Sequence, residues 1–435
     1  MSHPNRRTFV KTAAAAISTS ALPILGAAER VNVAVVGVGG RGRGHVEEYT
    51  QLPNCRVAAV CDVNQAAQER AVAIVEKRHG YKPRPYTDMR EVFASKDIDV
   101  VSIAAPNHWH ALATIWACQA GKDVYVEKPA CHNIYEGLKM IEAARKYNRV
   151  VQVGSQGRSV AHKRRAVELL RQGVIGDLYM AKGLCFKRRK SIGHKPDTAV
   201  PPGIDWDLFL GPAPMRPFNE LRYAYNWHWF WDTGNGDIGN QGVHEMDMCR
   251  WGMNDIGFPK SVVSTGGKFA YQDDQETPNT QLATFDYGDF QIVFEVRGLI
   301  TGDEGGLARR GEHTIGNIYY GSEGYMVVDV GGFQVYKGDK IQKVMDEKPA
   351  EPQWTPAPHM ANLLQAVRSR NPKDLNTDVE AGVMSACLCH LANISYRVGR
   401  KLTWDEARKQ FAGDAEANRL ISRDYRKPYV VPEKV

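Results

Sequence analysis

The apolar positions in the first part of the chain fall into short, nearly continuous runs separated by segments of helical length. Such runs occupy residues 31–36, 56–61, 100–105, 123–126 and 150–153. Short apolar runs without polar alternation are typical of strands buried on both faces of a parallel sheet. Amphipathic segments suited to helices lie between them, over residues 65–79, 109–120 and 136–147. This alternation predicts an α/β fold, a Rossmann-type domain over residues 29–153.

Beyond residue 153 the pattern changes to longer segments in which apolar and polar residues alternate. These segments are 178–186, 261–271, 281–286, 290–296, 318–320, 325–330 and 333–336. A period of two is typical of antiparallel strands with one buried face and one exposed face. We therefore predict a C-terminal α+β domain over 154–402 with a large, mainly antiparallel sheet, and an extension over 403–435. The exposed face of that sheet is a candidate surface for a homo-oligomer.

The N-terminal leader differs in character from the rest of the chain. Arg6 and Arg7 precede an apolar, alanine-rich run over 13–25 and the small residues 26–28. This layout resembles a twin-arginine signal peptide over residues 1–28, because the apolar run is short and its front is basic. It predicts passage through the twin-arginine export machinery to a periplasmic or secreted location. No later run is long enough to predict a membrane span.

Composition excludes several classes of protein. Apolar residues make up 43% and charged residues 24%, which is ordinary for a globular protein. The formal charge is +7, and three of the basic residues lie in the leader, so nucleic acid is not an expected partner. The basic runs 162–165 and 187–190 are interpreted as solvated faces. The eight cysteines lack metal-site spacing, so we expect no metal, while the sequence leaves a disulfide open.

A glycine-rich turn follows the first predicted strand. Its residues are Gly37, Val38, Gly39, Gly40, Arg41 and Gly42. The three glycines of a G-x-G-x-x-G motif allow a tight turn, close approach of backbone to a pyrophosphate, and packing of helix on strand. Asp62 ends the second strand about 20 residues later, where a carboxylate meets the adenosine ribose. Since no arginine follows Asp62 to offset repulsion of a 2′-phosphate, the pattern favours NAD over NADP.

The strand at 123–126 leads directly into Glu127, Lys128 and Pro129. Open α/β sheets bind ligands at the carboxyl ends of their strands, so Lys128 is predicted to face the ligand. Oxidation of a secondary alcohol needs a base on the hydroxyl, and a partly desolvated lysine beside a cationic nicotinamide has its pKa lowered toward the working pH.

The segment between residues 201 and 251 carries further candidate chemistry. Five of the nine tryptophans lie within it, interleaved with Asp237, Asn240 and His244. Aromatic planes beside polar groups suit sugar rings, although an aromatic core patch fits the same pattern. The sequence leaves these two interpretations open.

Taken together, these motifs resemble the Gfo/Idh/MocA oxidoreductases over residues 30–400. The resemblance implies that Lys128 bonds the reacting hydroxyl or carbonyl and that His244 is its acid/base partner. Asn240 stands where the family commonly has an aspartate, so it can orient a hydroxyl but cannot relay a proton. The resemblance also implies cofactor contacts from Ala105, Pro106, Asn107, His110, Glu127, Lys128, Gln156 and Trp206. It implies substrate contacts from Lys128, Arg158, Asp237, Asn240 and His244.

The sequence therefore predicts an exported NAD-dependent oxidoreductase that acts on a ring hydroxyl of a sugar or glycoside. Export after folding further predicts a tightly bound cofactor. Two alternatives stay open: an NAD-dependent, redox-neutral glycoside hydrolase, and a non-catalytic sugar-binding protein that holds NAD.

Overall fold

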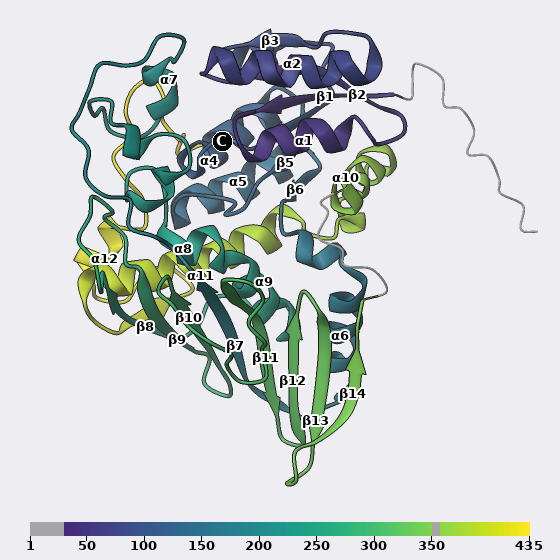
Figure 1. Cartoon of the computed structure of the whole chain (residues 1–435), viewed down its shortest axis with the longest axis vertical. Coiled ribbons are helices and arrows are strands. Elements are labelled where there is room, and N and C mark those ends of the chain that lie inside the picture. The colour runs from purple at the N-terminus through teal and green to yellow at the C-terminus, as the bar shows by residue number, and fades with distance from the viewer. Residues whose placement is uncertain (1–29, 350–356) are drawn as a thin grey trace, which may run out of the picture.

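The computed structural model describes residues 30–349 and 357–435, so the export signal predicted over 1–28 lies outside the described residues. The described chain forms a six-stranded and a ten-stranded sheet. The smaller sheet with its helices lies above the larger one, and the long helix α11 passes between them (Figure 1). Both the Rossmann domain and the large C-terminal sheet are as the sequence predicts.

The N-terminal domain is a doubly wound parallel sheet. Its strands are β1 (Val31–Val36), β2 (Cys55–Cys61), β3 (Arg84–Tyr86), β4 (Val100–Ile103), β5 (Asp123–Val126) and β6 (Val151–Val153). Its helices are α1 (Arg41–Tyr49), α2 (Gln65–His79), α3 (Met89–Ala94), α4 (Asn107–Gln119) and α5 (Ile134–Lys146). In the strand order β3-β2-β1-β4-β5-β6, the chain builds the sheet outward from β1 first on one side and then, from β4, on the other. All of the strands are parallel, and the switch point lies between β1 and β4. Ligands of open α/β sheets bind beyond the carboxyl ends of the strands at such a switch point.

The second domain is built on a sheet of order β14-β13-β12-β11-β7-β10-β9-β8-β15-β16. Its strands are β7 (Leu178–Lys187), β8 (Ser261–Gly267), β9 (Thr280–Asp286), β10 (Gln291–Arg297), β11 (His313–Gly321), β12 (Gly324–Asp329), β13 (Gly332–Lys337), β14 (Gln342–Glu347), β15 (Leu402–Asp405) and β16 (Gln410–Phe411). The strands β7 and β10 run parallel, and the other pairings are antiparallel.

Helices and short 3₁₀ turns connect these strands. The α-helices are α6 (Ala161–Arg171), α7 (Trp206–Leu210), α8 (Gly236–Asn240), α9 (Gly242–Gly252), α10 (Ala357–Ser369), α11 (Val379–Val398) and α12 (Ala415–Arg419). The 3₁₀ turns are η2 (Gln156–Ser159), η3 (Glu220–Arg222), η4 (Asn226–Trp229) and η5 (Pro372–Asp374). No helix among the described residues is long and apolar enough to cross a membrane.

Helix α11 packs closely on the N-terminal domain because glycines let it approach β6 and α5. A Cβ on its Gly382 would lie 2.4 Å from the Val153 side chain of β6. Gly137 of α5 allows the same closeness, since a Cβ there would lie 2.6 Å from Val383 of α11. The helices α9 and α11 also pack on each other. This packing sets the α8–α9 segment over the carboxyl ends of the parallel strands.

Two segments depart from the predicted division of the chain at residues 153 and 402. Helix α10 packs into the apolar core of the N-terminal domain through Met360, Leu363 and Leu364. The segment predicted as a C-terminal extension begins within β15, which pairs with β8 of the large sheet. It then runs back past α7 to α4 and α5, where the Tyr429 ring lies 5.4 Å from that of Trp109 (Figure 1).

The outer face of the large sheet is only partly open. Leu307 covers an apolar cluster there, formed with Leu184, Phe186, Ile318 and Val327. Toward the β8–β9 edge, Leu282 is 44% exposed. The use of this face in a homo-oligomer stays a prediction.

Candidate functional site

The glycine turn between β1 and α1 forms an open cradle. Gly37 has φ +81°, and a Cβ there would lie 2.5 Å from the Ala105 nitrogen. A Cβ on Gly42 would lie 1.8 Å from the Gly37 carbonyl oxygen, so helix α1 packs directly on the turn. A Cβ on Gly40, in contrast, would have no neighbouring atom within 4 Å. The turn therefore has the tight ends and the open middle that a pyrophosphate needs.

Asp62 is held at the edge of this cradle by the backbone. The Val38 N–H donates to its Oδ2 at 2.7 Å, and the Asn64 N–H donates to its Oδ1 at 2.9 Å. Burial raises the pKa of Asp62, and these N–H groups oppose that rise. Each carboxylate oxygen keeps a lone pair for a ribose hydroxyl, as NAD requires.

We expect Asp62→Ser to narrow the preference for NAD over NADP, because it removes the charge that repels a 2′-phosphate. Titration of the apo-protein with each dinucleotide measures the ratio of the two dissociation constants. Asp88→Ser, which removes a carboxylate at the N-cap of α3, is the matched control. A wild-type protein that binds both dinucleotides equally would contradict this role of Asp62.

Trp206 is the first residue of α7, and its side chain is bonded to other residues of the protein. Its ring stacks on Phe209 at 4.8 Å, and its Nε1 donates to the Arg216 carbonyl at 2.7 Å. The preceding loop pairs with the segment after Asp62, since the Asp205 N–H donates to the Val63 carbonyl at 2.9 Å. The structure thus gives Trp206 the role of an anchor for this loop, and the direct cofactor contact that the family resemblance implies stays a prediction.

Glu127 is buried beneath the glycine turn and is the centre of a hydrogen-bond network. Its Oε1 accepts from Arg41 Nε at 3.1 Å and Gln156 Nε2 at 3.1 Å, and it lies 3.0 Å from His45 Nε2. Although burial opposes ionisation, the His45 hydrogen bond and the Arg41 charge hold the pKa of Glu127 well below its usual range. Glu127, Arg41 and Gln156, predicted as cofactor contacts, are thereby linked to one another. The sequence did not indicate His45, whose Nδ1 lies 2.9 Å from Ser102 Oγ.

Lys128 comes directly after Glu127, and its peptide bond to Pro129 is cis. Its side chain points toward the second domain. Its Nζ donates to the Asn240 carbonyl at 2.9 Å and lies 3.5 Å from Asn240 Oδ1. Burial lowers the pKa of Lys128; the charge of Glu127 opposes this shift, whereas those of Arg41 and Lys187 add to it. The amine is therefore easier to deprotonate than an ordinary lysine, as a proton acceptor at this position requires.

The α8–α9 segment brings the other predicted residues to Lys128. Burial, supported by the Lys128 charge, lowers the pKa of His244 well below its usual range, so its imidazole is neutral at physiological pH. Asn240 Nδ2 donates to the Tyr225 hydroxyl at 3.0 Å. Both carboxylate oxygens of Asp237 accept from Arg189, from Nε at 2.9 Å and from Nη2 at 2.7 Å. The structure therefore gathers Lys128, Asn240, Asp237 and His244 at one edge of the parallel sheet.

Buried amides and a histidine hold this edge together. Asn107 Nδ2 donates to Asn235 Oδ1 at 3.1 Å, and Asn235 Nδ2 donates to the His132 carbonyl at 3.0 Å. His110 bridges two loops, since its ring nitrogens lie 2.7 Å from the carbonyls of Ala105 and Pro129. These contacts join the ends of β4 and β5 to the start of α8. Ala105, Pro106, Asn107 and His110 thus lie at the predicted edge, with the side chains of Asn107 and His110 bonded to protein.

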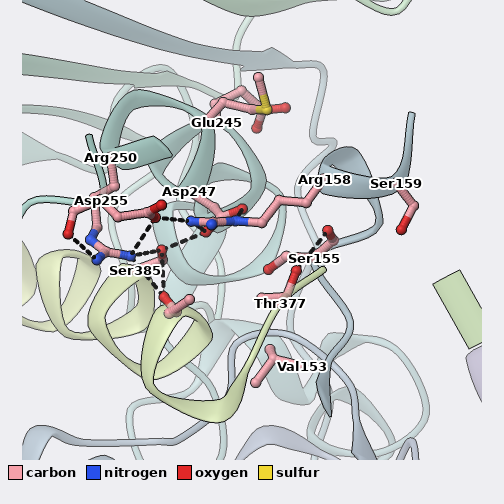
Figure 2. A network of polar contacts seen from close by, with 12 residues as sticks. Val153, Ser155, Arg158, Ser159, Glu245, Asp247, Arg250, Asp255, Thr377 and Ser385 are labelled. Carbon is pink, nitrogen blue, oxygen red and sulfur yellow. Dashed lines mark hydrogen bonds and ion pairs between the residues drawn. The ribbon is translucent and has the colours of Figure 1, made fainter. Parts of the chain in front are cut away.

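Two predictions about basic residues need correction. The resemblance implies that Arg158 contacts substrate, but its guanidinium is buried and donates to both oxygens of Asp247 at 2.9 Å and to Asp255 at 2.6 Å (Figure 2). The run 187–190 has the composition of a solvated face, yet Lys187 and Arg189 reach the site. Strand alternation was the missed signal for Lys187, because residues 185 and 187 point to the same face of β7 as Gly183, which packs against Cys249 of α9, whereas Arg189 lies two residues beyond the end of β7.

The cysteines and the aromatic residues bear on two open points. All eight cysteines are free thiols, and seven of them are buried. Trp251 lies under Arg158, with 5.3 Å from ring centroid to guanidinium, whereas the half-buried Trp227 stacks on His228 and packs against the apolar cluster of Trp206. Stacking of a sugar ring on these aromatic planes stays a prediction. No group of three or more potential metal ligands occurs in ranges 30–349 and 357–435.

Comparison with solved structures gives the same two-domain architecture. The WlbA dehydrogenase from Chromobacterium violaceum, in complex with NADH and UDP-GlcNAcA, superposes with a TM-score of 0.67 at 20% identity. That match covers 87% of this chain and 97% of the other. Levoglucosan dehydrogenase in complex with NADH and L-sorbose gives a TM-score of 0.63 at 17% identity, covering 86% and 99%. At these identities the likeness establishes the fold.

Among curated proteins, the chain is similar to glycosyl hydrolase family 109 proteins. A member from Shewanella sp. strain ANA-3 is 32% identical over 175 residues. The alpha-N-acetylgalactosaminidase of Shewanella oneidensis is 31% identical over 175 residues. Each match spans 38% of this chain and 38% of the relative.

Family models account for both domains. Residues 31–155 match the NAD-binding Rossmann fold of an oxidoreductase family, and residues 183–431 match the C-terminal alpha/beta domain of the same family. The cradle at Gly37–Gly42 and the carboxylate of Asp62 fit the dinucleotide that this domain binds. The chain therefore belongs to the Gfo/Idh/MocA oxidoreductase family, and its cofactor is NAD.

Proposed function

We propose that the protein oxidises a ring hydroxyl of a sugar or glycoside, with Lys128 and His244 as the acid/base pair. The observation that carries this proposal is the position of Lys128, whose lowered pKa and bond to Asn240 set a proton acceptor at the carboxyl end of β5. The sugar-bound dehydrogenase neighbours support a carbohydrate as the substrate.

The residues divide the reaction between them. NAD, when bound on the glycine turn, supplies the acceptor for the hydride. Lys128 Nζ, as the neutral amine, accepts the hydroxyl proton while the carbon–oxygen bond gains double-bond character. His244, neutral at physiological pH, holds the same oxygen or the neighbouring hydroxyl. Asn240 orients the substrate through its amide and carries no proton itself.

A redox-neutral glycoside hydrolase is the second candidate, favoured by the similarity to glycosyl hydrolase family 109 proteins. In that cycle a ring carbon is oxidised, the aglycone is eliminated, water adds, and the ring carbon is reduced again. The acid/base groups are the same, so the site geometry serves either reaction.

A panel of glycosides incubated with the purified protein distinguishes the candidates. Keto-sugars detected by mass, together with reduced cofactor, support the dehydrogenase. Free aglycone without net NADH supports the hydrolase. Tight sugar binding with neither product would overturn both and leave a non-catalytic sugar-binding protein.

We further propose export through the twin-arginine machinery with the cofactor already bound. A periplasmic enzyme that released NADH would lack a soluble pool of NAD to replace it. Repeated turnover therefore requires that the cofactor is retained and reoxidised in place, either by a second carbonyl substrate or by the last step of the redox-neutral cycle. We expect acid extraction of protein purified without added nucleotide to yield one NAD(H) per chain. A protein recovered empty, with a weak and freely exchanging site, would contradict retention.

A further inference from the structure

We propose that the sugar carries an anionic substituent, a uronate carboxylate or a sulfate ester, and that Lys187 binds it. This inference rests on the function proposed above and specifies its substrate class. It follows from an excess of positive charge beside Lys128 that the protein's own carboxylates do not neutralise.

The carboxylates nearest to Lys128 are already engaged by other cations. Glu127 is bonded by Arg41 of the glycine turn and lies against His45. Asp237 is held by Arg189, with the closest nitrogen–oxygen distance at 2.7 Å. Neither acid is therefore available as a full counter-charge for an additional lysine in the site, and burial raises the pKa of Glu245, the other buried acid that Lys187 faces, to about 8.

Lys128 and Lys187, in contrast, both donate to neutral amide oxygens. Lys128 Nζ donates to the carbonyl of Asn240 at 2.9 Å, and Lys187 Nζ donates to Oε1 of Gln241 at 3.1 Å. Because Asn240 and Gln241 are consecutive residues, the two ammonium groups converge on one short stretch between α8 and α9. Neither lysine forms an ion pair with any residue that the structure describes.

The position of Lys187 is fixed by the sheet. It is the last residue of β7 and pairs with His313 of β11. Strand alternation puts it on the face of Gly183, where a Cβ would lie 3.2 Å from the Cys249 sulfur of α9. The side chain therefore extends along the inner face toward the site and stays half-buried. The neighbouring Arg188 is bonded instead to the carbonyls of Arg189 and Gly298.

A half-buried ammonium bonded only to an amide is stabilised less than one paired with an anion. An acidic substituent on the sugar would supply that pairing while its hydroxyl faces Lys128. The competing explanation is that Lys187 acts on Lys128 alone, by helping to lower its pKa. The two explanations differ in whether the effect of Lys187 depends on the charge of the substrate.

The test compares an alkyl glucoside with the matching glucuronide and 6-sulfated glucoside, using the full-length protein loaded with NAD. We expect wild type to favour at least one acidic sugar by about tenfold or more in kcat/KM, the scale of one charge-assisted hydrogen bond. Lys187→Gln should abolish that preference by raising KM for the acidic sugar more than for the neutral sugar, while any change in the pKa of Lys128 affects all three sugars alike and leaves their ratio unchanged. Lys190→Gln, which removes an exposed charge from the same run, is the control and should keep the preference.

Other outcomes overturn the proposal. If wild type uses neutral and acidic sugars equally well, the proposal that the substrate carries an anionic substituent is wrong. A Lys187→Gln variant that shifts the pH profile equally for all three sugars and keeps the preference for the acidic sugar would leave Lys187 as a modulator of Lys128 only. If no sugar is turned over, the proposed function fails, and calorimetric binding of the same sugars to the NADH-loaded protein still decides whether Lys187 selects the acidic ones.

Discussion

Replacing Lys128 by methionine is expected to lower turnover by about a hundredfold or more, the usual contribution of a positioned acid/base group. Methionine keeps most of the aliphatic stem but removes the ammonium that donates to Asn240 at 2.9 Å. Because Glu127 carries the contacts to the glycine turn, folding and NAD binding should be retained. Steady-state kinetics on the best substrate of the glycoside panel measures the effect.

The pH profile gives an independent test of the same residue. Oxidation needs the neutral amine, so the rate should rise with pH as Lys128 loses its proton. Burial lowers the pKa of Lys128, which puts this rise below the range of an ordinary lysine. Lys190→Met is the control for loss of a lysine elsewhere on the same domain. A folded Lys128→Met protein with near-normal turnover would remove Lys128 from the mechanism.

Replacing Asp247 by alanine is expected to destabilise the protein by about 3–5 kcal/mol, the typical cost of breaking one side of a buried ion pair. Both partners are almost fully buried, with 2% of the Asp247 side chain and 5% of the Arg158 side chain exposed. Asp247 also accepts from Ser385 Oγ of α11 at 2.8 Å, as Figure 2 shows. Its loss would leave the Arg158 guanidinium buried with Asp255 as the remaining acid, which is 37% exposed.

Urea unfolding, with an unchanged m-value, measures this loss of stability. The matched control is Glu168→Ala, which breaks the exposed pair with Arg165 and should cost less than about 1 kcal/mol. Similar unfolding free energies for the two variants would contradict the structural role of the Arg158–Asp247 pair.

Much of the fold is predictable because the two domains have different periodicities. The central parallel strands are mostly apolar without alternation, and the antiparallel strands alternate, so each pattern gives its own type of sheet. Edge strands do not follow these patterns. The strand β3 contains Pro85 beside the exposed Arg84, and β14 is mostly exposed, so neither has an apolar run.

The site is predictable where its chemistry is local in sequence. The glycine turn, Asp62 and Lys128 each follow a strand directly, so topology alone brings them to one edge. The ion pairs of Arg158 and Arg189 could not be predicted in this way, because their acid partners are 89 and 48 residues away in the sequence. Only the folded chain shows that one pair supports the domain while the other borders the site. Packing likewise decides that Trp206 anchors a loop.

Because helix α10 packs into the core of the N-terminal domain, it restricts recombination between homologous proteins of this architecture. The polypeptide that follows the large sheet supplies Met360, Leu363 and Leu364 to a core whose other side is β1 and α1. A crossover between two homologous genes at residue 153 would bring together core halves from different parents. A stable recombinant would need a helix α10 whose apolar side chains fit the N-terminal core contributed by the other parent. The cofactor domain and this distant helix are therefore expected to be inherited as one unit, although most of the second domain separates them in the gene.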